Sequence, residues 1–82
     1  MVTQAELDRL EADLTAVRAQ MGVDREDALR RVGELQDHAA ELRERAVTSG
    51  SPYEPAVACV HELLGSLRRG LEVTGELRRM AA

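Results

Sequence analysis

The sequence predicts an all-α protein, an antiparallel helical bundle in a single domain that spans residues 1–82. Along most of the chain, apolar residues recur in alternating steps of three and four, the spacing that keeps one face of a helix against a neighbour. The apolar content is mainly Leu, Val and Ala, with no Ile, Phe or Trp, and such small side chains suit close packing of helices. Residues that start and stop helices stand at the ends of these repeats, so we expect three helices.

The first predicted helix covers residues 4–21. Thr3 and Glu6 form a capping box, in which each side chain bonds the other residue's backbone N–H group at the start of the helix. Charged residues occupy the face opposite the apolar repeat, so one side of this helix is expected to pack inside the protein. The apolar repeat consists of Leu7, Leu10, Leu14, Val17 and Met21.

The segment after the first helix, residues 21–24, has two interpretations. In the first, the helix ends with Gly22 in the left-handed conformation, and Asp24 caps a new helix. In the second, Arg25 joins the apolar repeat with one irregular step, and a continuous helix over residues 4–47 forms a two-helix hairpin with the last helix. A charged residue in the repeat and a glycine within a helix both favour the break.

The second predicted helix covers residues 25–47 and ends before a short turn over residues 48–51, which reverses the direction of the chain. Its first turn is acidic, as suits the positive end of the helix dipole. Its apolar repeat consists of Ala28, Val32, Leu35, Ala39, Leu42 and Ala46. Oppositely charged residues four positions apart are expected to pair on its exposed face: Glu26 with Arg30, Asp27 with Arg31, and Glu41 with Arg45.

The third predicted helix covers residues 52–80. Ser51 and Glu54 match a second capping box, and Pro52 falls at the first helical position, where its fixed φ is favourable. The apolar repeat consists of Tyr53, Val57, Val60, Leu64, Leu67 and Leu71, and then moves to another face of the helix with Val73, Leu77 and Met80. Three glycines within this helix are expected to allow close approach of a neighbouring backbone: Gly65, Gly70 and Gly75.

A chain of 82 residues is near the size at which one core only just offsets the loss of chain entropy. Because its apolar side chains are small, we expect the repeats to supply both the core and the interface of a homodimer. The continuous-helix alternative would leave the first repeat uncovered, and a second chain would have to bury it. The predicted core and interface residues are Leu7, Leu10, Leu14, Val17, Met21, Val32, Leu35, Leu42, Val57, Val60, Leu64, Leu67 and Leu71.

Composition and charge narrow the functional classes. The net charge of −4 argues against a general nucleic-acid-binding protein, and no apolar run is long enough to span a membrane. The N-terminus lacks the basic and apolar regions of a signal peptide, and one cysteine allows no internal disulfide, so we expect a cytoplasmic protein. That cysteine, Cys59, is interpreted as a small buried side chain, and we expect no metal, no cofactor and no catalytic residue.

The segment around His61 resembles two phosphohistidine motifs. Histidine phosphotransfer domains carry His-x-Leu-Lys-Gly-Ser on a helix, and here Leu64 takes the place of the lysine. The dimerisation helices of sensor kinases carry a box that begins His-Glu-Leu. These resemblances imply a phosphoacceptor role for His61, whereas its place beside the apolar repeat is more simply that of a half-exposed flanking residue. The matching residues are His61, Leu63, Gly65 and Ser66 for the first motif, and His61, Glu62 and Leu63 for the second.

The hairpin layout, with its turn near the middle of the chain, resembles the small WxG-type helical hairpins that are secreted as dimers. The tryptophan of that motif is absent, and Thr48-Ser49-Gly50 stands at the corresponding place with only the glycine in common. We expect a small helical protein–protein interaction or regulatory subunit that acts as a homodimer or with another helical protein, and not an enzyme. A histidine phosphotransfer protein and a WxG-type hairpin are the alternatives.

Overall fold

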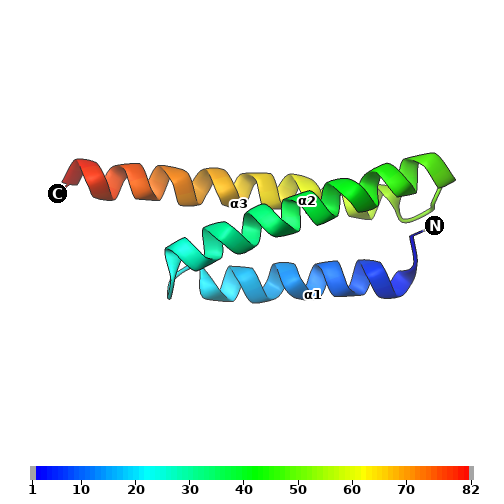
Figure 1. Cartoon of the computed structure of the whole chain (residues 1–82), viewed down its shortest axis with the longest axis horizontal. Helices are drawn as coiled ribbons and strands as arrows, with labels where there is room; N and C mark the ends of the chain where they lie inside the picture. The colour runs from blue at the N-terminus through cyan, green and yellow to red at the C-terminus, as the bar shows by residue number, and fades with distance from the viewer. Residues whose placement is uncertain (1, 82) are drawn as a thin grey trace.

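The computed structural model of the chain describes residues 2–81 and contains three α-helices packed against one another. They are α1 (Gln4–Gln20), α2 (Arg25–Ser49) and α3 (Glu54–Ala81). The helices α1 and α3 run in the same direction, and α2 runs against both (Figure 1). The prediction of an all-α protein with three packed helices is confirmed, and the alternative of one continuous helix over residues 4–47 is wrong.

The start of α1 follows the prediction and adds one buried residue. The Thr3 Oγ1 atom accepts a hydrogen bond from the Glu6 N–H at 3.2 Å, and the Thr3 N–H donates to Glu6 Oε1 at 3.3 Å, which completes the capping box. Val2, just before the cap, is only 2% exposed. Val2 and Leu7 occupy the two positions of a hydrophobic staple, and both belong to the buried cluster.

The break between α1 and α2 is present, but its geometry differs from the predicted one. Gly50 has the only positive φ among residues 2–81, so Gly22 is not in the left-handed conformation. Instead, the chain turns while the N–H groups of Val23 and Asp24 both donate to the Gln20 carbonyl, at 2.9 and 3.1 Å. Asp24 then caps α2 as predicted, because its Oδ1 atom accepts from the Asp27 N–H at 3.1 Å.

The end of α2 lies two residues beyond the predicted end, at Ser49. Gly50 follows in the left-handed conformation with φ of 64°, and its N–H donates to the Val47 carbonyl at 3.2 Å. The Ser51 N–H donates to the Ala46 carbonyl at 2.9 Å. This is the pattern by which a glycine closes a helix and satisfies its last carbonyl groups.

The closure of α2 also explains why the capping box predicted at Ser51 is wrong. A capping box needs the Ser51 N–H to be free for the Glu54 side chain, but that N–H is already bonded to Ala46. The Ser51 Oγ atom instead accepts from the Tyr53 N–H at 3.1 Å, and the Glu54 N–H donates to the Ser51 carbonyl at 3.2 Å. Pro52 and Tyr53 therefore lie in a turn, and α3 begins at Glu54 rather than at residue 52.

Gly50 and Gly22 form a matched pair for testing these two helix ends. Gly50→Ala is expected to lower the free energy of unfolding by about 1 kcal/mol, because a Cβ atom disfavours positive φ. Gly22→Ala is expected to be neutral or to raise it by up to about 1 kcal/mol, since its φ is not positive and its Cβ would meet open space. Urea denaturation of both variants measures this, and equal effects would contradict the assigned geometry.

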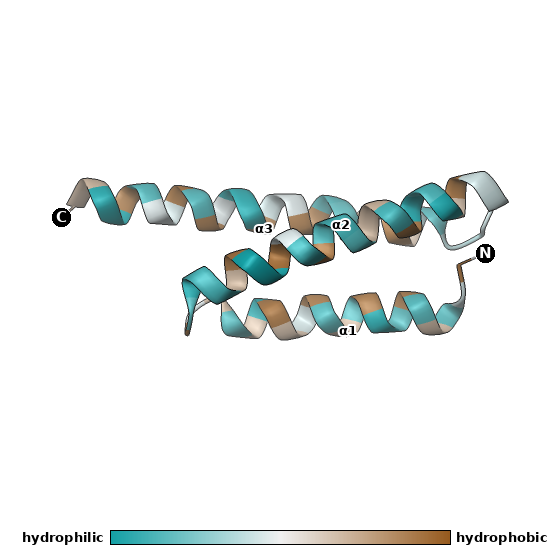
Figure 2. Cartoon of the chain, viewed as in Figure 1, coloured by the Kyte–Doolittle hydropathy of each residue, from teal (hydrophilic) through white to brown (hydrophobic). Residues whose placement is uncertain are grey.

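The core lies between the three helices and is formed by buried apolar residues of each. Figure 2 shows the apolar segments along the three helices. Every residue predicted for the core or interface is buried, apart from three that are half-buried against the core, namely Met21, Leu35 and Leu67. The most extensive contact is between α2 and α3, and the least extensive is between α1 and α3. Three fully buried alanines let α2 approach its neighbours closely: Ala28, Ala39 and Ala46.

Helix α3 is longer than the core that covers it. The molecule measures 49 × 18 × 15 Å, and the C-terminal part of α3 extends past the ends of both other helices (Figure 1). The last buried positions on α3 are Leu71 and Gly75, after which every described residue is exposed. The two ends of the chain lie at opposite ends of the bundle (Figure 1). The overhanging end of α3 is therefore an unpaired helix with apolar residues on it.

Candidate functional site

The most distinctive surface is a row of exposed residues on α3, which we name the exposed stripe. Its members follow one another in steps of three and four, as do the residues that line the contact between two paired helices. Its large apolar members are 46–82% exposed: Leu63 46%, Val73 53%, Leu77 59% and Met80 82%. Single exposed apolar residues are ordinary, but an aligned row of them indicates a contact surface. The exposed stripe consists of Leu63, Ser66, Gly70, Val73, Leu77 and Met80.

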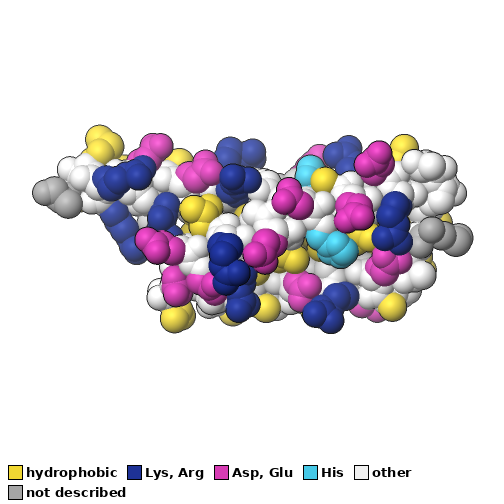
Figure 3. All heavy atoms as spheres, in the orientation of Figure 1, with side chains coloured by type: hydrophobic (Ala, Val, Ile, Leu, Met, Phe, Trp, Pro, Cys, Tyr) yellow, Lys and Arg dark blue, Asp and Glu magenta, His cyan; other side chains and the backbone are white. Residues whose placement is uncertain are grey.

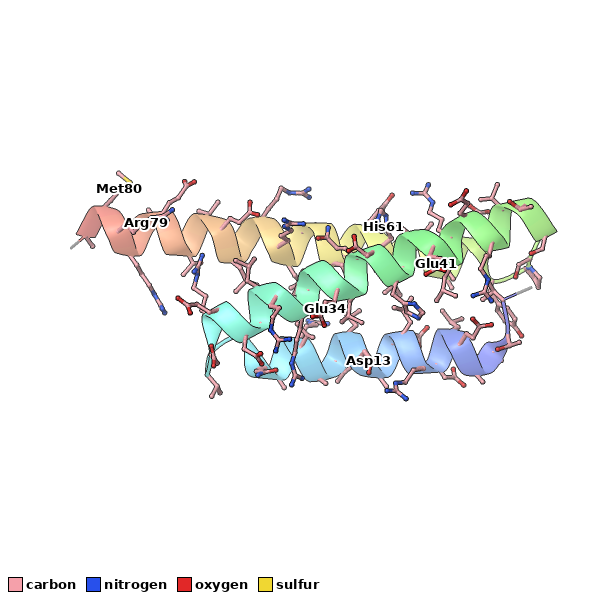
Figure 4. The ribbon with its side chains drawn as sticks, in the orientation of Figure 1. Asp13, Glu34, Glu41, His61, Arg79 and Met80 are labelled. Atoms are coloured by element: carbon pink, nitrogen blue, oxygen red, sulfur yellow. The ribbon has the colours of Figure 1, made fainter. Side chains whose placement is uncertain are left out.

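The exposed stripe lies on a different face of α3 from the buried repeat. Leu64 and Leu71 point into the core, and because successive helical residues are about 100° apart, Leu63 and Gly70 point well away from it. At the C-terminal end, Met80 points away from the other two helices (Figure 4). The sequence already indicated the rotated end of this stripe, but its exposure depends on where α1 and α2 end.

Arg25, at the start of α2, marks the end of the covered part of α3. Its guanidinium donates to the Leu71 carbonyl through Nε at 2.9 Å and through Nη2 at 2.6 Å. The same guanidinium lies directly against Gly75, so any Cβ atom at Gly75 would collide with it. The expected role of Gly75 in close approach is thus met by an arginine side chain rather than by a backbone. Gly70, in contrast, faces open space and is exposed.

Two hollows adjoin the exposed stripe, one between α1 and α3 and the other between α3 and the turn that joins α1 to α2. The first has a volume of about 190 Å³ and includes the stripe residues Leu63 and Ser66. The second has a volume of about 370 Å³ and includes Gly70. The first lies where the contact between α1 and α3 is limited. The first hollow is lined by Leu14, Arg18, Leu63, Ser66 and Leu67, and the second by Met21, Gly22, Arg25, Gly70, Leu71, Thr74 and Arg78.

Charged residues flank the exposed stripe on one side. Arg69 and Glu76 each precede a stripe residue, and both are exposed. Within residues 2–81 neither forms an ion pair, and Arg69 donates only to Ser66 Oγ, at 3.3 Å. On another face of the same helix, Arg68 pairs with Glu72 at 3.2 Å. Arg69 and Glu76 are therefore available to charges on a second molecule.

Elsewhere the ion pairs differ partly from those expected four residues apart. Asp27 pairs with Arg31 at 3.1 Å as expected, and also with Arg30, which bonds Glu34 rather than Glu26. The hydrogen bond from Arg30 is the largest cause that lowers the pKa of the Asp27 carboxyl. The arginines of these pairs are exposed, so the pairs support the start of α2 only weakly.

Within residues 2–81, an ion pair joins α1 to α2. Arg45, which was expected to pair with Glu41 on its own helix, bonds Glu6 of α1 at 2.9 Å. Partial burial raises the pKa of Glu6, but hydrogen bonds from Arg45 and Thr3 outweigh this effect and lower it. Charged side chains of both signs are interspersed over most of the face seen in Figure 3.

His61 is half-exposed on α3 and faces the C-terminal part of α2 (Figure 4). It lines a shallow hollow together with Arg43, Glu44 and other residues of α2. The other motif residues are dispersed, because Leu63 and Ser66 belong to the exposed stripe on another side of the helix. Within the part of the chain that the structure describes, no group of three or more His, Cys, Asp or Glu residues could hold a metal ion. The phosphoacceptor role of His61 stays a hypothesis.

Cys59 is exposed, so the interpretation of it as a buried side chain is wrong. It lies five residues before the buried Leu64 and four before Leu63, which places it on the side of the exposed stripe. Its position one residue from the buried Val60 misled the sequence interpretation, because adjacent helical residues point in different directions.

Comparison of the chain with protein families, with curated proteins and with solved structures found no match in any of the three. None of the helices within residues 2–81 is long and apolar enough to cross a lipid bilayer.

Proposed function

We propose that the chain is a small helical protein–protein interaction or regulatory subunit that acts as a homodimer and uses the exposed stripe as its contact surface. The observation that carries this proposal is the overhanging end of α3, where Val73, Leu77 and Met80 are exposed in helical register. Apolar residues with this spacing bind a second amphipathic helix by burying their side chains between the two helices.

Two further features support an interaction role. The buried repeat of the bundle ends at Gly75, so the apolar residues beyond it have no covering helix within residues 2–81. The stripe also continues onto the body of the molecule, where Leu63 and the hollow beside it lie next to α1. A partner helix would therefore contact both the overhang and the body of the bundle.

Leu77→Asp is expected to weaken self-association without disturbing the fold. Leu77 is 59% exposed, so a charge there costs little in the monomer but would have to be buried in the contact. Light scattering across a wide dilution series should show a dimer for the wild type. The Leu77→Asp variant should dimerise only at concentrations about tenfold higher than the wild type needs. The circular dichroism spectrum should stay helical.

Val47→Asp is the matched control, because Val47 is 60% exposed and lies on α2, off the stripe. This variant is expected to associate as the wild type does. A wild-type chain that stays monomeric at every concentration, or a Leu77→Asp variant that dimerises unchanged, would refute the proposed function.

A further inference from the structure

The exposed stripe has the pattern of a two-helix contact, and its sequence specifies how a second helix could lie on it. In such a contact, each stripe residue packs against a stripe residue of the second helix, and the two form a layer. The residue just before every second stripe residue lies at the edge of these layers and flanks the contact. On α3 these flanking residues are Glu62, Arg69 and Glu76, and all three are exposed. The corresponding positions on the other flank are Leu67 and Thr74, which carry no charge.

A parallel pair of α3 helices would not use these charges. In a parallel pair each flanking residue faces the opposite flank of the partner helix, so Arg69 and Glu76 would meet only uncharged side chains. Each layer would also contain the same residue twice. Gly70 opposite Gly70 would leave a gap, since nothing else lies near this glycine.

An antiparallel pair brings the charged flanks of the two helices together, and the charges then select one alignment. With Gly70 opposite Val73 of the second copy, Arg69 faces Glu76 of the second copy, and symmetry repeats this pair. A shift of one heptad in one direction sets Arg69 against Arg69 and Glu62 against Glu76. The opposite shift sets Glu76 against Glu76 and shortens the contact.

The selected alignment also matches the sizes of the side chains. Its layers set Gly70 against Val73, Ser66 against Leu77 and Leu63 against Met80 of the second copy. In the first two layers a small residue faces a large one, which lets the helix axes approach without voids. In the third, Met80 of the second copy would lie at the hollow of about 190 Å³ beside Leu63, and a flexible methionine suits an irregular space.

In this alignment the covered part of each α3 helix faces the overhang of the other. The two-fold axis would pass close to Leu71, near the point where α1 and α2 stop covering α3. Each overhang would then lie along the body of the other copy, with the two α1 helices at opposite ends of the contact. The part of α3 that a single chain leaves uncovered is the part that the second copy would cover.

On these grounds, and resting on the proposed function, we propose that the chain forms an antiparallel homodimer through α3, aligned by paired contacts of Arg69 with Glu76 of the second copy. Arg69→Glu and Glu76→Arg should each weaken self-association by about tenfold, because each places two like-charge pairs in the dimer. An equimolar mixture of the two variants should associate as the wild type does, since every facing pair is then of opposite charge. The double variant should also recover.

Arg79→Glu is the matched control, because Arg79 is an exposed arginine on the same helix that lies off both flanks. It is expected to leave the association unchanged. Sedimentation velocity at low salt measures all five proteins, and circular dichroism confirms that each is folded.

The single native cysteine measures the orientation independently. Cys59 is exposed and lies outside the paired layers, so a spin label on it should not disturb the contact. In the proposed dimer the two labels are about 37 Å apart along the helix axes, from the rise per residue. In a parallel dimer they would lie at roughly the spacing of packed helices, about 10 Å.

The outcomes separate this inference from the proposed function. Recovery of association in the mixture, together with the long distance between labels, supports the antiparallel alignment. If the wild type dimerises and Leu77→Asp prevents it, while the charge variants have no effect or the labels lie close together, the alignment is overturned and the proposed function stands. A wild-type chain that never associates overturns both.

Discussion

Leu64→Asp is expected to lower the free energy of unfolding by several kcal/mol. For a domain of this size, such a loss is enough to leave most molecules unfolded. Leu64 is fully buried in the middle of α3, where its side chain belongs to the cluster shared by all three helices. An aspartate there must either bury its charge without a partner or bind a proton, and both cost free energy. Urea denaturation followed by circular dichroism measures the loss.

Leu63→Asp is the matched control for this variant, one residue away on the same helix. Leu63 is 46% exposed, so its replacement is expected to change the stability of the monomer only slightly, and to weaken self-association instead. The pair thus separates the buried repeat from the exposed stripe. Similar losses of stability in both variants would show that the two faces of α3 are wrongly assigned.

Leu10→Asp is expected to have a comparable effect from the first helix. Leu10 is 0% exposed and belongs to the buried cluster. Because α1 has the least contact with α3, its attachment depends on a few side chains of this kind. We expect a loss of several kcal/mol, and detachment of α1 if the rest of the bundle survives.

Ala12→Asp, at an exposed position of α1, introduces the same charge without burying it. It is expected to change the thermal midpoint by no more than a surface substitution does. A Leu10→Asp variant with the thermal midpoint and solution mass of the wild type would mean that α1 is neither core nor interface. That result would contradict the three-helix architecture directly.

The sequence by itself determined the helices and their inner faces, because these depend on interactions between residues close together in the chain. The capping box of Thr3 and Glu6 forms as predicted, and Asp24 caps α2. The spacing of the leucines and valines identified residues that the structure buries or half-buries. Helical periodicity and capping are local properties, so a single sequence was enough to derive them.

The tertiary structure decided the features that depend on competition between groups distant in sequence or on the ends of neighbouring helices. The Ser51 N–H bonds Ala46 rather than Glu54, because closing α2 uses the group that a capping box needs. Arg45 reaches Glu6 on α1, which no spacing within α2 could predict.

The candidate site shows the same division. Spacing alone placed Val73, Leu77 and Met80 on one face of the third helix. Whether that face is core or surface was decided by the lengths of the helices, since α3 continues past the Arg25 contact where its neighbours end. An apolar stripe is buried or exposed according to what lies against it, and that depends on the whole fold rather than on the stripe.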